Sequence, residues 1–195
     1  WGILQAIGLA GILALPFLFI SWQWRIPAGV ILLGCYYWVT YPAFSHSILH
    51  GDHGGPYACV SWAALIIGAT IAGDLFHAQQ PNGILKQLIG FCVACSVMAI
   101  ILVVILGLPI SKSTVNPSYV MASLALCSLL FIVFYILGEK RKYSIPTLEV
   151  LGKNALLLFL IHYVLVKAMH ILTLKSASAW IVAALALTIY LLCFG

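Results

Sequence analysis

The stretch Leu85–Leu108 reads LKQLIGFCVACSVMAIILVVILGL and contains one charged residue, Lys86. An α-helix rises about 1.5 Å per residue, so a run of this length can cross the hydrocarbon core of a bilayer, which is roughly 30 Å thick. Six further apolar runs resemble it: Gly2–Ile20, Ile26–Pro42, Tyr57–Gly73, Ser118–Leu137, Leu148–Leu172 and Ala177–Phe194. Unpaired backbone groups are costly in hydrocarbon, and the alternating pattern of a β-barrel is absent. The sequence therefore predicts an all-α, polytopic membrane bundle of about seven transmembrane helices.

The composition of the chain excludes a soluble domain. Hydrophobic residues make up 64% of the sequence and charged residues 7%, whereas charged residues are about 25% of a typical soluble domain. We interpret residues 1–195 as a single membrane domain with lipids as partners and without nucleic acid. The formal charge of +5 is then information about topology. Because the chain begins at Trp1, inside an apolar run, we expect it to be a portion of a longer chain.

The basic residues predict the orientation of the chain. When the seven runs cross the bilayer alternately, one side carries more Lys and Arg than the other. That side has Arg25, Lys86, Lys140, Arg141, Lys142 and Lys153, and the opposite side has Lys112, Lys167 and Lys175. Positive residues mark the cytoplasmic side. We therefore expect the N-terminus outside, the C-terminus in the cytoplasm, and the chain in a bacterial inner membrane or an organelle membrane.

Small residues recur every fourth position in the third run, at Ala64, Gly68 and Ala72. This spacing lets a second helix approach closely, which is how membrane helices associate without a hydrophobic drive. We expect this run at the centre of the bundle.

The segment Ala43–Pro56 is predicted to be a loop on the outer side, and it contains His46, His50, Asp52 and His53. Histidine and aspartate can bind zinc or act as general bases. Turn-forming glycines and the absence of a rigid element favour a hydrated loop over a metal site, so no metal is predicted. A general-base role for one histidine remains open. The pair Cys92 and Cys95 also lacks further ligands and is interpreted as helix packing.

Two further candidate sites lie on the sixth run. His162 is expected near the bilayer midplane, where an ionisable group either lines a polar path or bonds to a neighbouring helix. Lys153 and Asn154 are expected at the cytoplasmic start of this helix. Free backbone N–H groups and nearby cations there would suit a phosphorylated ligand. Simple anchoring by positive residues is the alternative.

Several short motifs occur in an order that resembles the heparan-α-glucosaminide N-acetyltransferase family of membrane enzymes. The chain opens with GILQAIGL at Gly2–Leu9, similar to the family's GVLQRIGL. The stretch from Gly51 through Gly68 to Gly73 is similar to the family's outer loop and following helix. The remaining matches are PISK at Pro109–Lys112, SYV at Ser118–Val120 and LGKNAL at Leu151–Leu156 with His162 beyond.

The resemblance implies transfer of an acetyl group from cytoplasmic acetyl-CoA to an amino-sugar acceptor on the opposite side. It implies that Lys153 and Asn154 hold the CoA end, that His50, Asp52 and His53 border the acceptor, and that His162 lines the path between them. Two departures stand against it. The family's outer loop carries Asp-Pro-Glu-Gly where this chain has Asp52–Pro56 without a glutamate. The family's catalytic histidine precedes the residue matched by Gly2, so the resemblance implies that this chain is the C-terminal part of the fold and that no residue here inherits that role.

A non-catalytic, acyltransferase-like structural subunit of a larger membrane complex is the alternative. A homo-oligomer is compatible with both interpretations. A transporter is the third possibility, but the spans lack an inverted repeat and paired broken helices.

Overall fold

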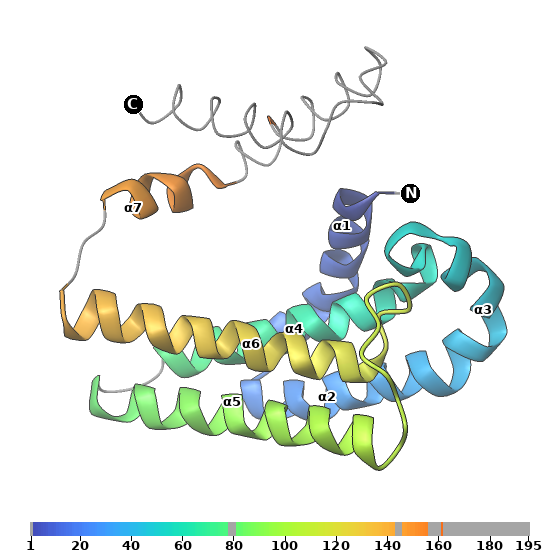
Figure 1. Cartoon of the computed structure of the whole chain (residues 1–195), viewed down its shortest axis with the longest axis horizontal. Helices are drawn as coiled ribbons and strands as arrows, with labels where there is room; N and C mark the ends of the chain where they lie inside the picture. Colours follow the sequence, from blue (N-terminus) through green and yellow to red (C-terminus); the bar gives the residue numbers. More distant parts are fainter. Residues whose placement is uncertain (1, 78–80, 143–145, 156–160, 162–195) are drawn as a thin grey trace. The chain divides into compact units, whose positions relative to one another are not determined.

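The computed structural model describes residues 2–77, 81–142, 146–155 and 161, and it divides the chain into two units at Ile136 (Figure 1). The first unit contains α1 (Ile3–Ala14), α2 (Trp22–Cys35), α3 (Tyr41–His50), α4 (Cys59–His77), α5 (Pro81–Val104) and α6 (Pro117–Tyr135). In the second unit, the short helix α7 (Pro146–Lys153) is described. The described residues form helices and turns without strands.

Four helical segments are long and apolar enough to cross a membrane: Trp22–His50, Pro56–Phe76, Gly83–Val104 and Pro117–Lys140. The helical segment Ile3–Phe19 is apolar but shorter. The protein is therefore a helical membrane bundle, as the sequence predicts. The expected number of seven spans remains a prediction, because Ala177–Phe194 and most of Leu148–Leu172 lie outside the described residues.

The second apolar run is longer than the sequence indicates. We expected it to end at Pro42, but helical structure continues through a π turn, Tyr36–Thr40, into α3 and ends at His50. Proline lacks an N–H donor and crowds the preceding turn. The π turn and a kink at Phe44, with φ −124° and ψ 24°, accompany Pro42, and such irregularities are the usual sites of helix bending. The expectation of a loop from Ala43 was therefore wrong.

Helix α4 forms the centre of the first unit, as its small residues predict. It packs against α1, α2, α5 and α6, and Ala64 and Ile67 are buried. A Cβ atom at Gly68 would lie 2.6 Å from Cδ1 of Leu124 on α6. Gly68 therefore allows the close approach of α6, in the manner of small residues at membrane helix interfaces.

The side chain of Arg25 joins three consecutive segments. Its guanidinium forms an ion pair with Asp74 of α4, with Nη1 and Oδ2 2.8 Å apart. It also donates to the carbonyl oxygens of Leu18 and Ile20, both at 3.0 Å, and to Oγ1 of Thr70 at 3.3 Å. The carbonyls of a helix end lack intrahelical partners. Arg25 therefore supplies donors to the end of the first helical segment while it holds α2 against α4.

The long helices of the first unit, α2, α4, α5 and α6, run in alternating directions along the chain (Figure 1). This alternation places Arg25, Asp74 and Lys86 at one end of the unit, which we call the Arg25 end. His50 and Lys112 lie at the other, which we call the His50 end. The grouping of these residues agrees with the charge analysis, which placed Arg25 and Lys86 on one side of the membrane.

We predict that Arg25→Met lowers the free energy of unfolding by about 3 kcal/mol, because it leaves several acceptors without their buried partner. Asp74→Asn should cost only about 1 kcal/mol, because the side chain of Asp74 is 41% exposed and solvent screens its half of the pair. Equilibrium unfolding in detergent micelles, followed by circular dichroism, measures both. Lys86→Met, at an exposed position of the same end, is the control. Equal stability of Arg25→Met and this control would contradict the assigned role of Arg25.

Candidate functional site

The His50 end is built from α3, the glycine-rich turn Gly51–Gly55, and the connection Ile105–Asn116 between α5 and α6. His46 and His50 are one helical turn apart on α3, and their rings stack with centroids 4.3 Å apart. Nδ1 of His50 lies 2.8 Å from the carbonyl oxygen of His46. A carbonyl oxygen only accepts, so the neutral ring carries its proton on Nδ1 and exposes a lone pair on Nε2. This is the form that a general base requires.

The turn after α3 adopts left-handed backbone conformations at three consecutive residues. The φ angles are 56° at His53, 80° at Gly54 and 63° at Gly55. A Cβ atom at Gly54 would lie 2.5 Å from Cβ of Ala58, so this position requires glycine for both reasons. The carbonyl of His53 accepts a hydrogen bond of 3.3 Å from Nε1 of Trp62 on α4. The turn is thus held against α4.

Asp52 lies in the same turn, within the short 3-10 segment Asp52–Gly54. The structure therefore brings the backbones of three predicted acceptor-side residues, His50, Asp52 and His53, to one end of the first unit. The side chain of Asp52 lies outside the described part. Among the described residues, no group of three or more His, Cys, Asp or Glu side chains is arranged so that it could bind a metal ion.

The connection Ile105–Asn116 is tied to the ends of α2 and α4. Oγ of Ser61 donates to the carbonyl oxygen of Val115 at 2.6 Å, and the hydroxyl of Tyr36 donates to the carbonyl oxygen of Thr114. Val115 has a φ of 48°, a strained conformation for a β-branched residue. Its side chain is buried in a core with Tyr36 and Ile48. Burial and the two neighbouring hydrogen bonds therefore maintain a conformation that the sequence alone disfavours.

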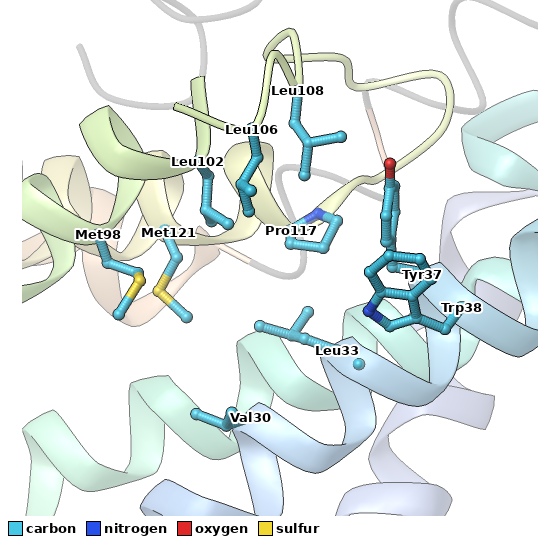
Figure 2. Close-up of a pocket in the computed structure, with 11 residues that line it drawn as sticks. Val30, Leu33, Tyr37, Trp38, Met98, Leu102, Leu106, Leu108, Pro117 and Met121 are labelled. Carbon is cyan, nitrogen blue, oxygen red and sulfur yellow. The ribbon is translucent and has the colours of Figure 1, made fainter. Parts of the chain in front are cut away.

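Two cavities adjoin this connection. One of about 220 Å³ is lined by Tyr36, Tyr37, Tyr41, Leu108, Pro109, Ser111, Thr114 and Asn116, and we call it the polar cavity because most of these residues carry a hydroxyl or amide group. An apolar one of about 320 Å³ lies between α2 and the facing parts of α5 and α6, and Figure 2 shows Val30 and Leu33 on one side of it and Met98, Leu102 and Met121 on the other. Tyr37 and Leu108 line both cavities. Hydrophobic periodicity did not reveal this arrangement, because both cavities depend on packing between helices distant in sequence.

The structure places Lys153 at the last position of α7 and Asn154 in the turn that follows, and Ala155 is again helical. The expectation that these residues lie at the start of a longer helix stays a prediction, because residues 156–160 lie outside the described part. Helix α7 begins at Pro146 and ends at Lys153, since proline is favoured in the first helical turn, where its missing N–H costs nothing. The backbone N–H of Asn154 donates to the carbonyl oxygen of Val150 at 3.1 Å. The side-chain amide donates to the same oxygen at 2.9 Å. The backbone N–H of Asn154 is therefore not free, and the side chains of Lys153 and Asn154 lie at exposed positions.

The remaining candidate, His162, lies outside the described residues. The ion pair of Arg25 with Asp74 was also missed by sequence reasoning, which used Arg25 only as a marker of topology. Two opposite charges at the same end of adjacent apolar runs were the signal that could have indicated it.

No family model, curated protein or solved structure matches the chain.

We predict that Tyr36→Phe destabilises the connection by about 1 kcal/mol, because the carbonyl of Thr114 loses its donor. Hydrogen–deuterium exchange of the backbone amides in Thr114–Asn116 should become faster. Tyr37→Phe is a matched control, since among the described residues no hydrogen bond involves the hydroxyl of Tyr37. Unchanged exchange in Tyr36→Phe would mean that this hydroxyl does not hold the connection.

Proposed function

We propose that this chain is part of a membrane acyltransferase that moves an acetyl group from cytoplasmic acetyl-CoA to an amino-sugar acceptor on the outer side. The order of the motifs that resemble the heparan-α-glucosaminide N-acetyltransferase family supports this reaction. The observation that carries it is the geometry of His50. Its ring exposes Nε2 at the end of the bundle that the charge distribution assigns to the outside.

In this proposal, His50 acts on the acceptor. As the amine nitrogen of the amino sugar attacks the acetyl carbonyl carbon, Nε2 accepts the proton that the nitrogen loses. The new bond is an amide, the thioester C–S bond of acetyl-CoA breaks, CoA leaves as the thiolate, and the imidazole becomes an imidazolium. General-base catalysis of this kind contributes about 10² to 10⁴ in rate. The bond from Nδ1 to the carbonyl of His46 orients the ring for this transfer.

The CoA end of the reaction is assigned to the opposite membrane face. Lys153 and Asn154 are the candidates there, and the support is their match to the family motif together with their exposure at the end of α7. Lys153 supplies a positive charge that suits a phosphate group of CoA. The role does not depend on free backbone N–H groups, because Asn154 uses its own within the helix.

A non-catalytic structural subunit of a membrane complex is the second candidate function, and the glycine turn favours it. The family's outer loop has a glutamate, whereas this turn is closed around Gly54, where any side chain would meet Ala58. An acidic side chain therefore does not fit at the position of Gly54 in this turn. Such a change is compatible with a loss of catalysis.

We predict that His50→Ala lowers the rate of acetyl transfer by about 100-fold or more, because the general base is lost. The assay supplies radiolabelled acetyl-CoA on one side of vesicles that contain the full-length protein, with glucosamine on the other side. His46→Ala is the matched control. It removes the stacked ring but keeps the backbone carbonyl that orients His50, so its rate should stay within a few-fold of the wild type.

Two outcomes would decide against parts of this proposal. Equal rates in His50→Ala and His46→Ala would remove His50 as the general base. If the wild-type protein transfers no acetyl group from either side, the structural subunit becomes the better account.

A further inference from the structure

Three cavities follow one another along one side of α2. The polar cavity at the His50 end shares Tyr37 and Leu108 with the apolar cavity next to it. That cavity in turn shares Val30, Leu33, Met98 and Met121 with a third one of about 210 Å³. We call the three together the α2 groove. Neighbouring cavities share lining residues, so the three lie next to one another from Tyr41 to Arg25.

The groove is polar at one end and apolar over the rest of its length. The third cavity is lined almost entirely by apolar side chains of α2, α4, α5 and α6, and Arg25 lies at its far end. At about 1.5 Å per residue, the α2 positions from Arg25 to Tyr37 span about 18 Å, which exceeds the roughly 15 Å that one leaflet contributes to the hydrocarbon core. An extended lipid acyl chain that enters the groove at the His50 end would therefore contact apolar side chains over a length equal to the depth of one leaflet.

The polar end of the groove offers hydrogen-bond donors and no carboxylate. Tyr37 and Tyr41 line it, and among the described residues neither hydroxyl has a hydrogen-bond partner. Ser111 also lines it, and the exposed Lys112 follows directly in the chain. None of the residues that line this cavity is acidic. Hydroxyl donors beside a lysine suit a phosphate group.

The π turn Tyr36–Thr40 lies where the polar and apolar parts of the groove meet. At this turn, consecutive aromatic residues have different environments. Tyr36 is buried and bonds to the carbonyl of Thr114, whereas Tyr37 and Trp38 line the groove (Figure 2). Tyrosine and tryptophan are enriched at the depth of lipid head groups, and single π turns are frequent at functional sites.

We propose that the α2 groove binds an anionic glycerophospholipid of the leaflet at the His50 end. Its phosphate lies in the polar cavity near Tyr37, Ser111 and Lys112, and one acyl chain lies along α2 between Leu33 and Met121. Charge complementarity favours this occupant, since the cavity lining has hydroxyl groups and no carboxylate, and the exposed Lys112 follows Ser111 in the chain. This inference does not depend on the acyltransferase reaction.

Native mass spectrometry of the full-length protein, purified in mild detergent and mixed with phosphatidylglycerol or phosphatidylcholine, tests the proposal. The wild type should retain phosphatidylglycerol in preference. Gly34 lines the apolar cavity, and a Cβ atom there meets nothing within 4 Å. Gly34→Leu therefore fills the groove without a backbone clash, and we expect about tenfold weaker retention of phosphatidylglycerol.

Gly90→Leu is the matched control. Gly90 also lies within a helix with nothing within 4 Å of a Cβ atom, and it lines none of the three cavities. It should retain phosphatidylglycerol as the wild type does. The double variant Tyr37→Phe with Lys112→Gln removes a donor and the cation, so its retention of phosphatidylglycerol should fall to that of phosphatidylcholine.

Photo-crosslinking of the wild type with a phosphatidylglycerol that carries a diazirine on its acyl chain gives a second measurement, which does not depend on the folding of a variant. Adducts on peptides that contain Met98 or Met121 are expected. Equal retention by Gly34→Leu and Gly90→Leu, or adducts confined to other peptides, would overturn the proposal. Crosslinks from a cysteine at position 34 to residues 156–195, without lipid adducts, would also overturn it and assign the groove to the chain itself.

Discussion

The arrangement of the first unit depends on the hydrogen bonds and the ion pair that the guanidinium of Arg25 forms. A charged side chain within a membrane helix is costly unless its donors are paired. Arg25 pairs with the end of the first helical segment through Leu18 and Ile20, and with α4 through Thr70 and Asp74. These acceptors come from two segments that precede and follow α2, so the pairing sets the position of α2 between them. Helix α4, held in this way, then packs against the remaining long helices.

The position of α4 also determines the His50 end. Trp62 holds the carbonyl of His53, and Ser61 holds the carbonyl of Val115, so two consecutive residues of α4 support both the glycine turn and the connection between α5 and α6. The exposed ring of His50 and the polar end of the α2 groove are thus attached to one rigid helix. A rigid support is what a binding or catalytic group needs to keep its geometry. This is why a shift of α4 should affect both features together.

The long apolar segments and the central helix could be predicted from the sequence, because they depend on composition and on local spacing. Leu85–Leu108 overlaps most of α5, and Gly68 indicated a close contact with another helix, which the structure shows to be α6. Other features depend on contacts between distant residues. The pairing of Arg25 with Asp74 joins separate helices, and the left-handed Val115 opposes its own residue preference. The helical placement of His50 was missed because Pro42 is usually a helix stop, and here a π turn precedes it.

Accessibility of single cysteines in intact membranes tests the central claim most directly, namely that the first unit is a membrane-spanning bundle with His50 and Lys112 at one end and Lys86 at the other. In a background without native cysteines, a membrane-impermeant maleimide is applied from each side to Lys112→Cys and to Lys86→Cys. Position 112 should react only from the outside and position 86 only from the cytoplasm. Labelling of both positions from the same side would contradict the alternating arrangement and, with it, the placement of His50 on the acceptor side.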